Sequence, residues 1–335
     1  MSAVASSSLA APRPGGRVLV RLRRNQSVLL LCGVLVALVI VGLIGIEGFT
    51  EKTNITSILL LSSFLGIAAI GQTLVALVGG IDVSIPFVMT SANIGLAKLL
   101  SLGWSPVAAV LAVLAAAALI GVLNGLLSWT LGVHPLLVTL GVGFALLGGI
   151  EVFYSNAQSG APEWLTQLSS ANGKTFGLGV PPIVVIWILL GAVVILALRQ
   201  TVLGRYVYAS GDNPVAAERM YARRRMIWIG LFMLSAMAAA AAGILLLGFT
   251  GAGDTTVGAP YLLTTIAAVV VGGTTLLGGV GGYSRTMVGA LLLSVLNTLL
   301  VGFGVDPNLQ QTVLGLIIVA MVSLYARESH PRNSI

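Results

Sequence analysis

An acidic residue stands at the point where one long apolar stretch gives way to the next. The segment reads GGIDVS at residues 79–84, and its two glycines permit a sharp turn of the backbone. A carboxylate in strongly apolar sequence is costly and usually serves a function, so Asp82 and Ser84 are candidates for a gate or a solute contact. The alternative is structural, because Asp or Ser at the start of a helix can cap free N–H groups.

Two asparagines lie inside apolar stretches, where an amide needs a hydrogen-bonding partner. Asn124 occurs in VLNGLL and Asn297 in VLNTLL. Each amide can bind a hydroxylated solute, or it can join two helices by a hydrogen bond, and the sequence leaves both interpretations open. Together with Asp82 and Ser84, the two asparagines form the predicted solute pathway.

A third segment, GRYVYASGDNPVAAER at residues 204–219, is too polar and basic to face lipid. The Asn-Pro pair is a turn signal that begins a short helix, and the small Ala-Ala face after it lets a partner pack closely. The length of this segment favours a docking element over a solvated loop. The candidate docking residues are Gly204, Arg205, Tyr208, Gly211, Asn213, Pro214, Ala216 and Ala217.

Catalytic chemistry has little support in the sequence. The glycine runs within 272–282 lack the Gly-Lys-Ser/Thr of a phosphate-binding loop. Cys32 is the single cysteine, and His134 and His330 are the only histidines, so a zinc site is not expected. We therefore expect a chain that is not an enzyme and that binds no cofactor or metal itself.

The elements that position these residues follow from composition. The 335 residues are 57% hydrophobic and 8% charged, whereas soluble domains are about 25% charged. A spanning helix needs about 20 mostly apolar residues. The sequence predicts an all-α polytopic membrane protein with ten transmembrane helices, at 27–47, 56–78, 84–101, 106–130, 135–154, 181–199, 226–249, 260–281, 286–303 and 309–326.

The distribution of positive charge predicts the orientation. With a cytoplasmic N-terminus, ten spans place all 14 arginines on the cytoplasmic side, as the positive-inside rule requires. Nucleic acid is therefore not an expected partner despite the net charge of +7. The expected organisation is a cytoplasmic tail (1–26), a transmembrane domain (27–326) and a cytoplasmic C-terminal tail (327–335). Its long loops are expected to be external at 155–180 and cytoplasmic at 200–225.

Three pairs of matching segments predict an internal repeat. GGIDVS (79–84) resembles GAGDTT (251–256) at an offset of 172, and VLNGLL resembles VLNTLL at an offset of 173. Gly132 and Pro135 match Gly304 and Pro307, again at 172. An offset of five spans reverses orientation, so we expect a 5+5 inverted-topology repeat with the solute path between the halves.

These segments resemble the ribose/xylose/arabinose class of sugar permeases from ATP-binding-cassette (ABC) importers, within a broader group that includes branched-chain amino acid permeases. The resemblance covers roughly residues 55–326 and rests on four segments that follow the family order. They are VGGIDVS (78–84), GVLNGLLSWTLGVHPLLVTLG (121–141), GRYVYASGDNPVAAERM (204–220) and IAAVVVGGTTLLGGVGG (266–282).

The resemblance implies a permease of the bacterial inner membrane that translocates a small polar solute, foremost a monosaccharide. It implies a second permease copy or a homologous permease, two cytoplasmic ATPase subunits or a fused double ATPase, and an extracytoplasmic binding protein. ATP and magnesium would be used by the ATPase, and the 204–220 segment would carry the coupling helix.

Departures from the family pattern leave alternatives open. Leu262 and Thr264 stand where family members often carry acids, and Met220 to Arg223 replace a small Ser-Gly pair. These changes are compatible with one half of a heterodimer, and with a nucleoside, a furanone-type signal or a branched-chain amino acid as solute. An ion-coupled secondary transporter is the alternative from another class, although Asp82 alone is a candidate to carry the ion.

Overall fold

The computed structural model describes residues 31–153, 160–175, 177, 179–219 and 223–328. The predicted tail 1–26 and residues 329–335 lie outside the described residues. The described part of the chain consists of helices and loops, with one isolated bridge between Gly160 and Ala252.

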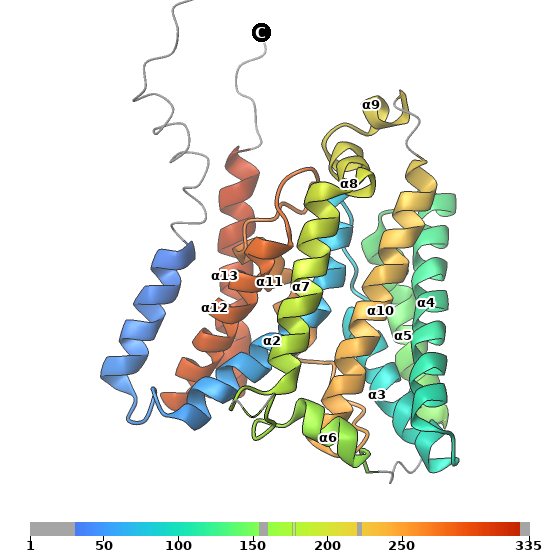
Figure 1. Cartoon of the computed structure of the whole chain (residues 1–335). Coiled ribbons are helices and arrows are strands. Elements are labelled where there is room, and N and C mark those ends of the chain that lie inside the picture. Colours follow the sequence, from blue (N-terminus) through green and yellow to red (C-terminus); the bar gives the residue numbers. More distant parts are fainter. Residues whose placement is uncertain (1–30, 154–159, 176, 178, 220–222, 329–335) are drawn as a thin grey trace, which may run out of the picture.

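The helices form one bundle (Figure 1). After a first helix, Leu31–Gly45, they are α2 (Lys52–Leu77), α3 (Ile85–Ser101), α4 (Pro106–Leu131), α5 (Pro135–Phe153), α6 (Glu163–Ser169), α7 (Pro182–Gln200), α8 (Val202–Asp212), α9 (Pro214–Arg219), α10 (Arg224–Thr250), α11 (Tyr261–Val271), α12 (Tyr283–Gly302) and α13 (Pro307–Glu328). The short helices α8 and α9 lie at one end of the bundle, and α6 lies at the other.

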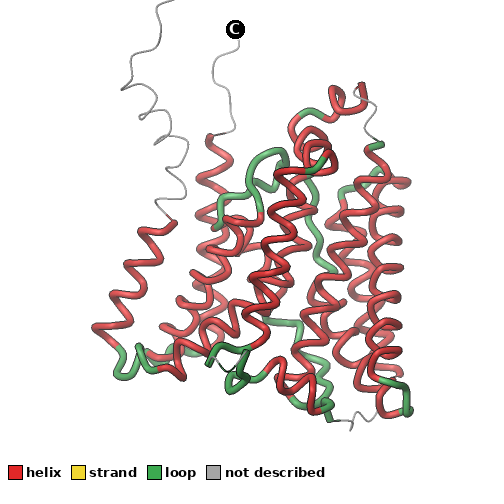
Figure 2. The backbone as a smooth tube through the Cα atoms, in the orientation of Figure 1, coloured by secondary structure: helices red, strands yellow, loops and turns green. Residues whose placement is uncertain are grey.

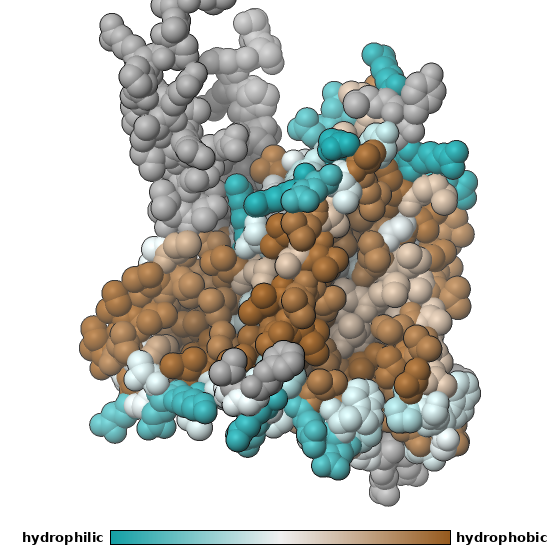
Figure 3. All heavy atoms as spheres, viewed as in Figure 1, coloured by the Kyte–Doolittle hydropathy of each residue, from teal (hydrophilic) through white to brown (hydrophobic). Residues whose placement is uncertain are grey.

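The surface confirms a polytopic membrane protein. A broad hydrophobic surface lies between hydrophilic residues at the two ends of the bundle (Figure 3). Every predicted span contains a helix, but only five of the described helices are both long and apolar enough to cross a membrane: α2, α4, α7, α10 and α12. The count of ten spans therefore stays a prediction.

The predicted helix at 260–281 is wrong in its second half. Helix α11 has 11 residues and a length of about 16 Å, which is roughly half the hydrocarbon core. Residues 272–282 form a loop instead (Figure 2). Five glycines in this loop have positive φ, from 73° at Gly279 to 147° at Gly282, a region that glycine adopts readily.

Helix α10 is packed closely against its neighbours because small residues lie at the contacts. Gly121 and Gly125 of α4, four residues apart, lie against the α10 backbone at Phe232 and Ile229. On α2, Gly71 faces Ser235 in the same way. Such spacing lets helix backbones approach closely in lipid, and it holds α2 and α4 beside one helix.

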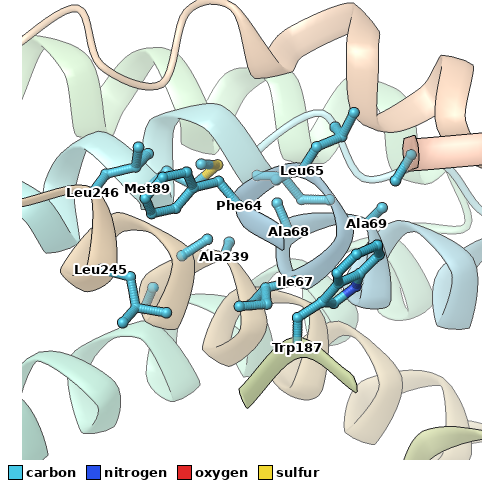
Figure 4. Packing of buried hydrophobic residues seen from close by; sticks show 14 of the residues in the cluster. Phe64, Leu65, Ile67, Ala68, Ala69, Met89, Trp187, Ala239, Leu245 and Leu246 are labelled. Atoms are coloured by element: carbon cyan, nitrogen blue, oxygen red, sulfur yellow. The ribbon is translucent and has the colours of Figure 1, made fainter. Parts of the chain in front are cut away.

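The apolar core joins α2 to α3, α7 and α10 (Figure 4). Phe64, Ile67 and Met89 are fully buried at its centre. Trp187 of α7 packs onto α2 at Gly66, and its indole N–H donates to the hydroxyl of Tyr283 at 3.0 Å. The core therefore holds α2 in place, and α2 leads directly into residues 78–84, which we call the Asp82 segment.

Candidate functional site

The chain breaks its helical structure inside the bundle just before Asp82. Helix α2 ends at Leu77, Gly79 adopts a φ of 84°, and α3 begins only at Ile85. The connection turns back into the bundle (Figure 1), and the Asp82 amide donates to Oε1 of Gln72, on α2, at 3.3 Å. Asp82 is therefore held below the end of α2, among helices.

Hydrogen bonds join the Asp82 carboxylate to Ser84 and α10, and join Ser84 to α4. Its Oδ1 accepts from the amide and hydroxyl of Ser84 at 2.9 and 2.6 Å. Its Oδ2 accepts from Ser235 of α10 at 2.6 Å, and Asn124 of α4 donates to Ser84 Oγ at 2.9 Å. The structure thus brings three of the four predicted pathway residues together. We call Gln72, Asp82, Ser84, Asn124 and Ser235 the Asp82 cluster.

The cluster is closed, and it does not form the plain helix cap considered from sequence. Asp82 is 1% exposed and Ser84 and Asn124 are fully buried, and Ser84, at the start of α3, makes no side-chain cap bond. Two polar atoms of the cluster, Gln72 Nε2 and Asn124 Oδ1, have no hydrogen-bonding partner within the described part of the chain. The cluster therefore keeps one donor and one acceptor unused.

Asn297 lies in a different place from the other three predicted residues. It lines a cavity of about 600 Å³ between α2, α10, α11, α12 and α13. Asp254, Thr256, Gln310 and Gln311 line the same cavity, and we call it the Asp254 cavity. Its volume falls within the range of small-molecule sites. Leu262 and Thr264 also line it.

Residues 251–256, which we call the Asp254 segment, repeat the hydrogen-bond pattern of the Asp82 segment. Asp254 Oδ1 accepts from the amide and hydroxyl of Thr256 at 2.7 and 2.8 Å. The Asp254 amide donates to the side-chain oxygen of Asn93 at 2.9 Å, as the Asp82 amide does to Gln72. Asp254 and Thr256 were absent from the predicted pathway, although the 172-residue offset pointed to them.

The predicted docking segment forms two helices, α8 and α9. The Asn-Pro turn begins α9 as predicted, and the Asn213 side chain accepts from the Ala216 amide at 3.0 Å. Arg205, Asn213, Pro214 and Ala216 are exposed. Ala217 instead is fully buried against the bundle, so the small face expected from sequence is divided between the surface and the interior.

The remaining docking candidates face the bundle. Gly204 and Ala217 are buried, and Gly211 leaves no room for a side chain because the backbones of Leu77 and Gly279 lie against it. The Tyr208 hydroxyl donates to the carbonyl of Gly281 at 3.1 Å. Burial raises the pKa of this hydroxyl above its usual value, so it stays protonated as a donor.

One backbone hydrogen bond joins the last residue of α2 to the loop after α11, beneath α8. The Gly279 amide donates to the carbonyl of Leu77 at 2.9 Å. Gly211 lies against both residues, and Gly278 lies against Gly211 and Gly79. We call these residues the glycine junction. It places the end of α8 directly on the segment that leads to Asp82 and on the loop that follows α11.

Similarity to known proteins extends along most of the chain. Residues 54–322 match the family described as "Branched-chain amino acid transport system / permease component". The ribose import permease protein of Escherichia coli (strain K12) is 34% identical over 302 residues, which cover 87% of this chain and 91% of that protein. The fructose import permease protein of Rhizobium meliloti is 31% identical over 282 residues, covering 82% and 78%.

A third relative, the D-allose transport system permease protein of Escherichia coli (strain K12), is 30% identical over 288 residues, covering 85% of this chain and 87% of that protein. No solved structure matches the chain. Because the family match and the relatives span most of its helices, this chain belongs to the branched-chain amino acid transport system permease family.

Proposed function

We propose that the chain is the membrane-spanning permease subunit of an ATP-driven importer for a monosaccharide. The observation that carries this proposal is similarity over 82–87% of the chain to permeases named for ribose and fructose import. The polar groups inside the bundle support it, because amides and hydroxyls can exchange hydrogen bonds with an uncharged polyol.

The partners follow from the same family. We infer a second permease copy or a homologous permease, two ATPase subunits or a fused double ATPase, and an external solute-binding protein. The exposed residues Arg205, Asn213, Pro214 and Ala216 on α8 and α9 are the proposed surface for the ATPase. ATP and magnesium belong to that partner, and solute affinity rests largely with the binding protein.

Orientation in the bacterial inner membrane is inferred from charge. The 199–225 region contains six arginines, which lie on or beside α8 and α9 and at the start of α10: Arg199, Arg205, Arg219, Arg223, Arg224 and Arg225. We propose that this end and both termini are cytoplasmic and that the α6 end is external. The matched hydrogen-bond patterns at Asp82 and Asp254 support a 5+5 inverted repeat, with the solute path between its halves.

Uptake by the reconstituted complex tests the function. The permease, its ATPase and its binding protein in proteoliposomes should accumulate ribose, fructose or allose only when ATP is supplied on the ATPase side. Complexes lacking the ATPase are the control. Uptake driven by an ion gradient in the absence of ATP would contradict the proposal and favour a secondary transporter.

A further inference from the structure

We propose that the Asp254 cavity binds the solute directly, through the free carboxylate oxygen of Asp254 and the amides of Asn297 and Gln311. The inference rests on the proposed function and names the site within one permease where the solute is held. It gives a role to a carboxylate that the predicted pathway did not include. The class of ligand is an uncharged molecule with several adjacent hydroxyl groups.

The hydrogen bonds within the cavity leave groups for a ligand. Oδ1 of Asp254 is occupied by Thr256, whereas Oδ2 has no hydrogen-bonding partner within the described part of the chain. Asn297 and Gln311 likewise make no side-chain hydrogen bond to the described residues, and both line the cavity. The site therefore offers one charged acceptor and two amides, each of which can both donate and accept.

Neighbouring helices hold Asp254 in position. Its amide is bound by Asn93 of α3, whose own amide group donates to the Gly243 carbonyl of α10 at 3.3 Å. Four residues further on, the Gly258 amide donates to Thr90 of α3 at 3.1 Å. A group fixed before the ligand arrives loses little conformational freedom on binding, so the carboxylate is presented in a defined place.

Apolar surface completes the site. Phe249, at the end of α10, is 47% exposed and lines the cavity. Its ring is held against Phe64 of α2 with centroids 5.4 Å apart. Tyr261 of α11 contributes a second aromatic side chain to the lining. Small-molecule sites commonly combine such apolar walls with a few polar groups in defined positions. The C–H face of a sugar ring can pack against the aromatic surface.

Replacing one oxygen of Asp254 tests the site. Asp254→Asn keeps an oxygen that can accept from Thr256, so the turn is retained, but it removes the charged acceptor. We expect initial uptake by the ATP-driven complex to fall about tenfold, because hydrogen bonds to charged groups are the stronger ones. The melting temperature and the affinity of the binding protein for the sugar should stay unchanged.

Asp306→Asn is the matched control. Asp306 is exposed and accepts from the Asn308 amide at 2.8 Å in the same kind of turn, but it does not line the cavity. It should retain wild-type uptake. Equal uptake by Asp254→Asn and Asp306→Asn would overturn the cavity site while leaving the importer intact. Failure of the wild-type complex to take up any sugar would instead refute the proposed function and this inference with it.

Accessibility gives an independent measurement. In the assembled complex on a Cys32→Ala background, Gln311→Cys should react with a membrane-impermeant maleimide from the external side. A transported sugar, drawn from ribose, fructose and allose, should slow this reaction several-fold. Val202→Cys, an exposed position at the start of α8 outside the proposed ATPase surface, should react only from the opposite side, at a rate that sugar leaves unchanged. Labelling of Gln311→Cys that is absent from the external side, or insensitive to sugar, would contradict the proposal.

Discussion

The Asp82 and Asp254 segments share one local structure but have opposite surroundings. In each, the carboxylate binds the amide and hydroxyl two residues further along the chain, and the Asp amide is held by a side chain from another part of the chain. Ser235 of α10 covers the second oxygen of Asp82, whereas the second oxygen of Asp254 borders a cavity. The two turns therefore differ in what lies next to the second carboxylate oxygen: a helix covers it at Asp82, and a cavity borders it at Asp254.

The largest expected difference between the two segments is in stability. Asp82→Ala leaves the Ser84 amide and two hydroxyls buried without their acceptor. We expect it to lower the free energy of unfolding by about 3 kcal/mol or more, because each buried donor left unpaired costs about 1–3 kcal/mol. Asp254→Ala should cost about 1 kcal/mol, since water can reach its partners. Thermal unfolding in detergent measures both, and equal losses would show that the two turns are alike in burial.

The glycines that end the preceding helices give a second matched pair. Gly79 and Gly251 have φ values of 84° and 78°, so alanine at either position costs about 1–2 kcal/mol in backbone strain. A Cβ at Gly79 would also lie 3.2 Å from the Leu277 carbonyl, whereas a Cβ at Gly251 has nothing within 4 Å. We expect Gly79→Ala to melt at a lower temperature than Gly251→Ala. The reverse order would show that the glycine junction is more compliant than its contacts indicate.

The smallest expected effect is the difference between replacing Asn124 and replacing Asn297 by leucine. Asn124→Leu removes one hydrogen bond to Ser84, worth about 0.6 kcal/mol on average between membrane helices, and we expect a slightly lower melting temperature with nearly normal uptake. Asn297→Leu should leave the melting temperature unchanged and reduce uptake. Uptake and melting curves on the same preparations test the pair. A normal uptake rate in Asn297→Leu would remove it from the solute pathway.

The sequence predicted the polar residues better than the elements that carry them. Asp82, Ser84 and Asn124 were identified because charge and amide groups stand out in apolar sequence. Ser235 and Gln72 were missed, since a single serine or glutamine in a helix carries no motif. The end of the helix at Val271 was also missed. Glycine, valine and leucine keep the mean hydropathy of residues 272–282 high, so hydropathy alone does not show that the helix has ended. Asn297 was grouped with Asn124, but it lies on α12 and lines the Asp254 cavity, whereas Asn124 is buried in the Asp82 cluster.

The glycine junction has a mechanical consequence. Where side chains meet, a push of a fraction of an ångström is absorbed by rotation about χ angles. At Gly211, Gly279 and Leu77 the contacts are between backbone atoms, so no side-chain rotation can absorb a small displacement there. We therefore expect a displacement of α8 to reach both the segment before Asp82 and the loop after α11. We expect the two non-helical segments to move together, and such coupling would keep one segment from opening the solute path while the other stays in place.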